Sequence, residues 1–173
     1  MKNLFQAFAK YNESVNQSIM ELLKPLKKEQ IMMKTKAYYP SIFETLLHNL
    51  IADLNWLRRY RDALKENKAL NNGKPLSLEE KGLRLEFDSD YTKFFQYRRQ
   101  VDELMIQFVN ELDEGKMGLI IKYKNYKGEE IEKELWKTLL HLFNHQTHHR
   151  GQVSVLLDLI GIDHDYSSLA TRI

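Results

Sequence analysis

Apolar residues recur every three or four positions along two long stretches in the first half of the chain. The first stretch runs from Leu4 to Leu26, where Pro25 and the polar sequence "KKEQ" mark its end. The second follows Pro40 and Ser41, which form a helix-start signal, and stays periodic to about Leu64. This spacing predicts two long amphipathic helices.

The second half of the chain predicts two further helices with a segment of another kind between them. A third helix is predicted from Ser89 to Leu112, with Asp88 to Asp90 as its N-cap, and a fourth ends at Ile160, before the capping Gly161. Between them, β-branched and aromatic residues alternate with lysines around the turn signal "NYKGE". A short β-hairpin is therefore predicted directly before the last helix.

Together these elements predict an all-α fold, an antiparallel four-helix bundle in which one long connection carries the hairpin. The length of 173 residues suits one domain with a substantial core, so residues 1–173 are assigned to a single domain. With 7 Gly and 3 Pro, the chain contains few helix breakers, which agrees with a helical fold.

Charge and cysteine content narrow the function classes. The formal net charge is only +2, so the chain lacks the basic surplus that drives binding to a nucleic-acid backbone. The absence of cysteine excludes disulfides, cysteine-ligated zinc and a cysteine nucleophile. No apolar run reaches the ~18 residues of a membrane span, and the first residues lack the apolar core of a signal peptide. A soluble, cytoplasmic protein that binds no membrane is expected.

Four of the six histidines fall within "HLFNHQTHHRGQ", residues 141–152, on the last predicted helix. On a helical wheel His145 and His149 lie about 40° apart and are the pair most directed toward the apolar arc. His141, His148 and Gln152 lie along the edge of that arc. The inward pair is therefore the first candidate for a site.

Two histidines at positions i and i+4 lie on adjacent turns, where both imidazoles can converge on one metal ion. The pair His141 and His145 has the same spacing and stays open as an alternative, as does a hydrogen-bonded core histidine without metal. No glutamate stands beside the first histidine of "HQTHH", so the base of an "HExxH" metalloprotease is missing. His148 is interpreted as a polar residue beside the site rather than a ligand.

A third ligand would come from another helix. His48 lies in a narrow polar stripe on the second predicted helix, and periodicity leaves open whether that stripe faces solvent or an inner cavity. The other histidine, His164, follows Gly161 and is interpreted as a solvated loop residue. The stripe consists of Glu44, His48, Ala52, Asn55 and Arg59.

Three stretches resemble the DinB family of four-helix-bundle metalloproteins, which is related to the YfiT-like and bacillithiol-transferase group. They are "YNESVNQSIMELL" near the start, "LLHNLIADLNWLRR" on the second helix, and "HLFNHQTHHRGQVSVLLDLIGID" on the last. The resemblance covers both ends of the chain, whereas residues 77–113 match only in general character. It implies that the polar stripe faces the bundle interior.

The resemblance also implies a divalent metal bound by three histidines, which map onto His48, His145 and His149. Three imidazoles leave open coordination positions, as in catalytic zinc sites. Such ligands suit zinc or nickel most and do not exclude iron or manganese. Related proteins use a low-molecular-weight thiol as cosubstrate, and a homodimer is the family's habit. Exposed aromatics would be compatible with that dimer, and we expect Tyr38, Tyr39, Phe94 and Phe95 to be exposed.

Neighbouring residues receive alternative interpretations. Asp53 is a partner beside the site or between helices, or a surface charge, and its wheel position opposes direct ligation. Trp56 is interpreted as a packing residue. Arg150 either forms an exposed ion pair or holds an anionic substrate group, and Gln152 orients His145 or caps a polar layer. No catalytic residue beyond the ligands is assigned.

Three hypotheses follow from the sequence. The first is a metal-dependent enzyme that activates a low-molecular-weight thiol or water, as a thiol S-transferase or a related hydrolase or isomerase does. The second is a non-catalytic metal-binding or stress-response module, in which the ion stabilises the bundle. The third is a helical interaction protein with a polar core layer and no metal.

Overall fold

Four long helices dominate the computed structural model, which describes residues 1–77 and 79–173, without the side chains of residues 85, 88, 89 and 91. The long helices are α1 (Lys2–Leu23), α3 (Ile42–Ala63), α6 (Tyr91–Glu111) and α7 (Leu135–Leu159). The shorter elements are α2 (Lys28–Ile31), α4 (Lys68–Asn71), α5 (Glu80–Ser89), two 3-10 turns at Lys74–Ser77 and Glu114–Lys116, and strands β1 (Ile120–Lys124) and β2 (Glu130–Glu134). The all-α prediction with a hairpin before the last helix is confirmed.

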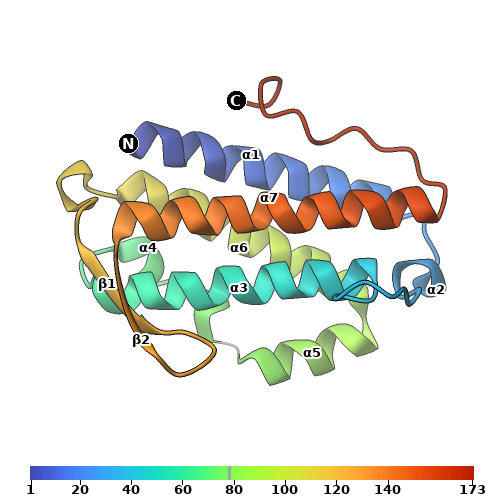
Figure 1. Cartoon of the computed structure of the whole chain (residues 1–173), viewed down its shortest axis with the longest axis horizontal. Coiled ribbons are helices and arrows are strands. Elements are labelled where there is room, and N and C mark those ends of the chain that lie inside the picture. The colour runs from blue at the N-terminus through green and yellow to red at the C-terminus, as the bar shows by residue number, and fades with distance from the viewer. Residues whose placement is uncertain (78) are drawn as a thin grey trace.

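The bundle is built from two antiparallel helix pairs (Figure 1). One pair is α1 with α6, whose opposite ends meet through the side chains of Gln6 and Asn110. The other is α3 with α7, joined through His48 and His145. Because α3 and α6 run in the same direction, the chain must return along the bundle between them, and α4 and α5 lie on that return path.

The ends of the long helices follow local rules. The Ser41 hydroxyl accepts a hydrogen bond from the backbone N–H of Glu44, as expected of an N-cap residue. Asp90 caps α6 through the N–H of Thr92, whereas the side chains of Asp88 and Ser89, also assigned to this cap, lie outside the described part. The first helix ends at Leu23 rather than Leu26: Lys24 still has helical dihedral angles, and Pro25 has no N–H with which to continue the hydrogen-bond pattern.

The hairpin extends one side of the bundle beside the C-terminal half of α3 (Figure 1). Its strands pair with Tyr123 opposite Ile131, and Gly128 in the turn has a φ of 81°, which favours glycine. Ile121 and Tyr123 are two residues apart and therefore point to the same face. Ile121 is buried, and the ring of Tyr123 contacts Trp56 on α3.

A layer of buried polar side chains crosses the bundle near its middle. Arg98 on α6 donates to Asp53 on α3 and to Asp102 on its own helix, both at 2.7 Å. Asp102 also accepts from Asn16 on α1, and Asp53 accepts from Gln146 on α7. Since each of the four long helices contributes a group, the layer fixes how the helices are aligned along the bundle.

The expected exposure of three aromatic residues is corrected. Phe94 is 1% exposed and packs against Phe43 and Phe87, so it is a core residue. Tyr39 and Phe95 are half-buried, and only Tyr38 of the four aromatics is largely exposed. Within the described part of the chain, every helix is too short or too polar to cross a membrane.

Candidate metal centre

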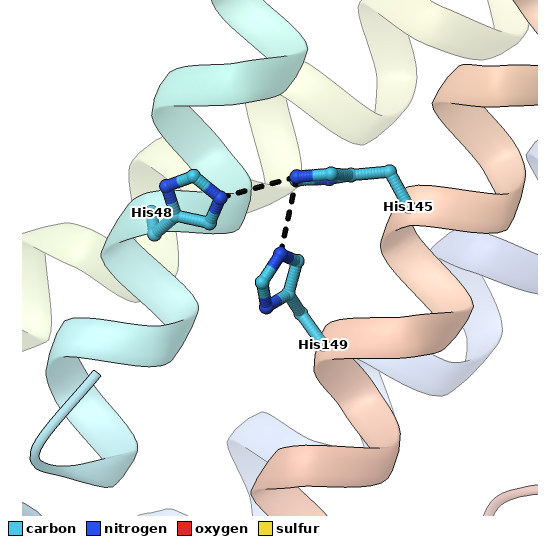
Figure 2. Close-up of side chains that lie close together, drawn as sticks. All are labelled: His48, His145 and His149. Atoms are coloured by element: carbon cyan, nitrogen blue, oxygen red, sulfur yellow. Dashed lines mark hydrogen bonds between the residues drawn. The ribbon is translucent and has the colours of Figure 1, made fainter. Parts of the chain in front are cut away.

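Three histidine side chains from two helices converge at one point between α3 and α7 (Figure 2). Nε2 of His145 lies 3.1 Å from Nε2 of His48 and 3.1 Å from Nε2 of His149. Two nitrogens at this separation, each about 2.05 Å from a shared ion, would subtend about 98° at that ion. This angle lies between those of octahedral and tetrahedral sites, so the cluster has the dimensions of a metal centre.

Hydrogen bonds on the far side of two rings orient the converging nitrogens. Nδ1 of His149 lies 2.7 Å from Oε1 of Gln152, so this nitrogen donates and leaves the Nε2 lone pair directed at the cluster. Nδ1 of His48 lies 2.8 Å from the hydroxyl of Tyr39, whose ring also stacks on the imidazole. A proton on Nε2 of His145 could form a linear hydrogen bond to only one of the two neighbouring nitrogens, those of His48 and His149. One metal cation can accept the Nε2 lone pairs of all three histidines.

Burial keeps the three imidazoles neutral. Desolvation, followed by the neighbouring His149 and Arg84, lowers the pKa of His48 to about 4. Desolvation and the surrounding histidines lower the pKa of His145 to about 3. Desolvation also lowers the pKa of His149, opposed by its hydrogen bond to Gln152. Near neutral pH the cluster therefore offers three uncharged nitrogen donors, the form that binds metal.

The donor set fits a divalent transition metal with open positions. In the described part of the chain, His48, His145 and His149 form the group of histidines and acids whose ligand atoms all lie within 4.8 Å of one another. Imidazole suits zinc, nickel, copper and iron, and neither a thiolate nor a carboxylate joins this group to narrow the choice. Three protein ligands are the number typical of catalytic rather than structural zinc sites.

The structure separates the other predicted residues. His141 stands one turn before His145, with ring centroids 6.0 Å apart, and packs against Trp56 instead of joining the cluster. His148 is exposed and contacts Gln152. The prediction that Gln152 orients His145 is wrong: three residues separate it from His149 and seven from His145, and it reaches only the nearer ring.

Two further assignments are corrected by burial. Arg150 is 3% exposed, donates to Asn12 at 2.5 Å and lies over the ring of Tyr11, so it is neither an exposed ion pair nor open to a substrate. His164 is half-buried, and its Nε2 lies 3.1 Å from Asp158. The burial of Arg150 could have been predicted from the sequence, because on the helical wheel this residue lies about 140° from His145 and next to the apolar arc.

A pocket of about 560 Å³ opens on one side of the cluster, and we call it the histidine pocket. It contains His48 and His145 together with residues from α3, α5 and the hairpin. The polar stripe of α3 lines or borders this opening and is half-buried at most positions. Of its members, His48 points between α3 and α7, whereas Asn55 is exposed. The fully buried side chains of α3, such as Asp53 and Leu50, occupy the bundle interior. The pocket is lined by His48, Ile51, Ala52, Asn55, Trp56, Arg59, Glu80, Arg84, Tyr123, Asn125, Tyr126, His141 and His145.

A second, more apolar pocket of about 330 Å³ lies on the other side of the cluster. Tyr39 and Gln152, which contact His48 and His149, form part of its wall, together with Val155 and Leu159 of α7. Sequence reasoning missed the role of Tyr39, because the residue lies in a loop without periodicity. Its place directly before the Pro40–Ser41 helix start was the available signal.

Two comparisons of the sequence with known proteins found matches. The sequence model of the DinB family matches residues 1–166 of the chain. A curated relative, Protein DinB of Bacillus subtilis (strain 168), is 28% identical over 160 residues, which cover 87% of this chain and 83% of the relative.

Proposed function

The chain belongs to the DinB family, and from this premise we propose that it is a divalent-metal-dependent enzyme whose ligands are His48, His145 and His149. The proposed reaction is the activation of a low-molecular-weight thiol or of water for attack on an electrophile, as in a thiol S-transferase. The observation that carries the proposal is the convergence of three Nε2 atoms beside an open pocket.

A divalent ion held there would act as a Lewis acid and would let a thiol or water lose its proton near neutral pH. Side chains of the protein would orient the metal ligands and provide the space for the substrates. Gln152 and Tyr39 hold the rings of His149 and His48 in place. The two pockets on either side of the cluster offer separate places for a thiol and an electrophile.

Metal analysis of tag-free protein tests the first part of the proposal. Wild-type protein should contain about one divalent ion per chain, and the identity of that ion, zinc or nickel in our expectation, is read directly. His145→Ala should lose most of this metal, because His145 is the ligand adjacent to both others. Equal and near-zero metal in both proteins would refute a metal centre and leave a helical interaction protein with a polar core.

A screen of the metal-loaded protein with thiol and electrophile pairs tests the catalytic part.

One observation favours a second candidate, a non-catalytic metal-binding module: the ligands come from α3 and α7, so an ion would tie two helices together. That module predicts full metal occupancy without turnover of any pair. The homodimer and the cytoplasmic location remain expectations that size measurement and fractionation would check.

A further inference from the structure

Arg59 presents a guanidinium to the histidine pocket without a carboxylate partner. Its Cζ lies 4.6 Å from the ring centroid of Trp56 and 4.6 Å from that of Tyr123. Its Nη2 donates to the backbone carbonyl of Lys124 at 3.3 Å. A guanidinium has five N–H donors, so most of its hydrogen-bonding capacity is not used by this contact.

The charge of Arg59 is not neutralised within the described part of the chain. The other guanidinium of the pocket, Arg84, lies 3.1 Å from Glu44 and 3.8 Å from Glu80, whereas no described carboxylate lies within 4 Å of Arg59. Desolvation by burial lowers the pKa of Arg59 from its ordinary value. A half-buried cation without a counter-charge is costly, and an anion bound beside it would remove that cost.

Two aromatic rings hold the guanidinium in a fixed position. Trp56 and Tyr123 stand at 68° to each other with centroids 4.9 Å apart, and Arg59 occupies the corner between them. Rings attract the face of a guanidinium, which leaves its edge free for hydrogen bonds in the plane of the group. A planar edge with paired N–H donors matches a carboxylate best, because both oxygens can be bound together.

The distance from the metal centre to this edge sets the size of the ligand. His48 and Arg59 are eleven residues apart on α3, which corresponds to about 16 Å along the helix axis. The arginine side chain leans toward the helix N-terminus and shortens the separation to roughly 10 Å. That is about the length of three extended amino-acid residues.

We propose that Arg59 selects the substrate of the histidine pocket by holding a carboxylate roughly 10 Å from the metal centre. This inference rests on the proposed metal-centre function and deepens it by naming the residue that distinguishes carboxylate substrates from neutral ones. Trp56 and Tyr123 position Arg59. The hairpin, which supplies Tyr123, is thereby part of the binding site.

Binding of mercapto acids to the cobalt(II)-loaded protein tests the inference without an activity assay. The probe is 8-mercaptooctanoate, of comparable extended length, and its control is 8-mercaptooctanol, which has the same thiol and chain without the charge. Thiol binding to cobalt is read from the visible spectrum, and affinity from titration. The acid should bind at least about tenfold more tightly than the alcohol, as expected of hydrogen bonds to a charged group. The short 3-mercaptopropionate should show no such advantage over its alcohol.

Variants at Arg59 decide whether this residue causes the preference. Arg59→Gln should abolish the advantage of the acid and leave the affinity for the alcohol and the cobalt content unchanged. Arg59→Lys, which keeps the charge and loses the planar fork, should retain only part of the advantage. Arg61→Gln is the matched control, since it removes the same charge from α3 outside the pocket and should leave the advantage intact.

The outcomes separate this inference from the proposed function. Full cobalt occupancy and thiol binding without a preference for the acid would overturn the inference alone. A preference that survives in Arg59→Gln, or that disappears equally in Arg61→Gln, would also overturn it. A protein that binds no cobalt would overturn the proposed function and the inference with it.

Discussion

Replacement of Arg98 by methionine should destabilise the protein strongly, because it leaves two buried carboxyl groups without their counter-charge. Arg98 and its partners Asp53 and Asp102 have side chains between 1% and 5% exposed. Methionine fills most of the vacated volume, so the loss of charge and of two hydrogen bonds dominates the effect. Breaking a buried ion pair by removing one partner costs about 3–5 kcal/mol.

The corresponding change in melting temperature follows from the size of the chain. The entropy of unfolding of 173 residues is about 0.36 kcal/mol/K near the midpoint. A loss of about 3–5 kcal/mol therefore lowers Tm by about 8–14 °C. Denaturant unfolding followed by circular dichroism gives the free energy, and a thermal scan gives Tm. The matched control is Arg99→Met on the exposed face of the same helix, with an expected loss below about 1 kcal/mol.

The pH dependence of the loss distinguishes charge from packing. Burial raises the pKa of Asp53 and of Asp102 even with Arg98 beside them, and removal of Arg98 raises both further. Above the unfolded pKa of about 4, the folded variant then binds more protons than the unfolded chain, so its stability falls as pH rises. The wild type shares this slope up to the pKa of its Asp102, about 6. The deficit should therefore be smallest below about pH 6 and should grow as pH rises above it.

Two results would refute this reasoning. One is a loss no larger than that of Arg99→Met, which would mean that the polar layer contributes nothing beyond packing. The other is a deficit that stays constant with pH. The triple variant Asp53→Asn, Arg98→Met, Asp102→Asn should recover part of the stability, because it removes the buried charges together.

The remaining predictions concern the histidine cluster. In metal-free protein, the neutral forms of His48 and His145 contribute stability that is fully present above about pH 6.5 and is lost as pH falls toward 4 and then 3, because the pKa values of both residues are lowered in the folded state. The free energy of unfolding measured as a function of pH checks this dependence. His145→Ala should make that dependence weaker. Gln152→Leu should weaken metal binding by about 10- to 100-fold, measured by chelator competition, because His149 loses its orienting acceptor, whereas exposed Asn144→Ala should have no effect. Chelation of bound metal should lower the free energy of unfolding by about 1.4 kcal/mol for each tenfold decrease in free metal, provided the metal stays above its Kd.

The four long helices could be predicted because each buries one face, and burial imposes a 3.6-residue period that the sequence displays. How the helices are connected in space could not. That α3 and α6 run parallel depends on tertiary contacts, such as the pair of Asp53 and Arg98, which are 45 residues apart. Periodicity shows which face of a helix is buried and does not name the helix that covers it.

In the candidate site, too, helical periodicity predicts some residues and not others. His145 and His149 share one helix, so wheel geometry selects them from four histidines. His48 has no periodic relation to them, and only resemblance to a family linked it to the pair. Tyr39 and Tyr123 come from a loop and a strand, where helical spacing carries no information, and the structure alone shows that one contacts His48 and the other Arg59.

The polar layer and the histidine cluster depend on one helix register. On α7 the candidate ligands His145 and His149 are each followed by a buried residue of the polar core, Gln146 and Arg150. Gln146 donates to Asp53 on α3, and a slip of one residue would rotate α7 by about 100° and break that bond. The same slip would turn both imidazoles away from His48. The contacts that fix this register therefore also direct the two imidazoles of α7 toward His48.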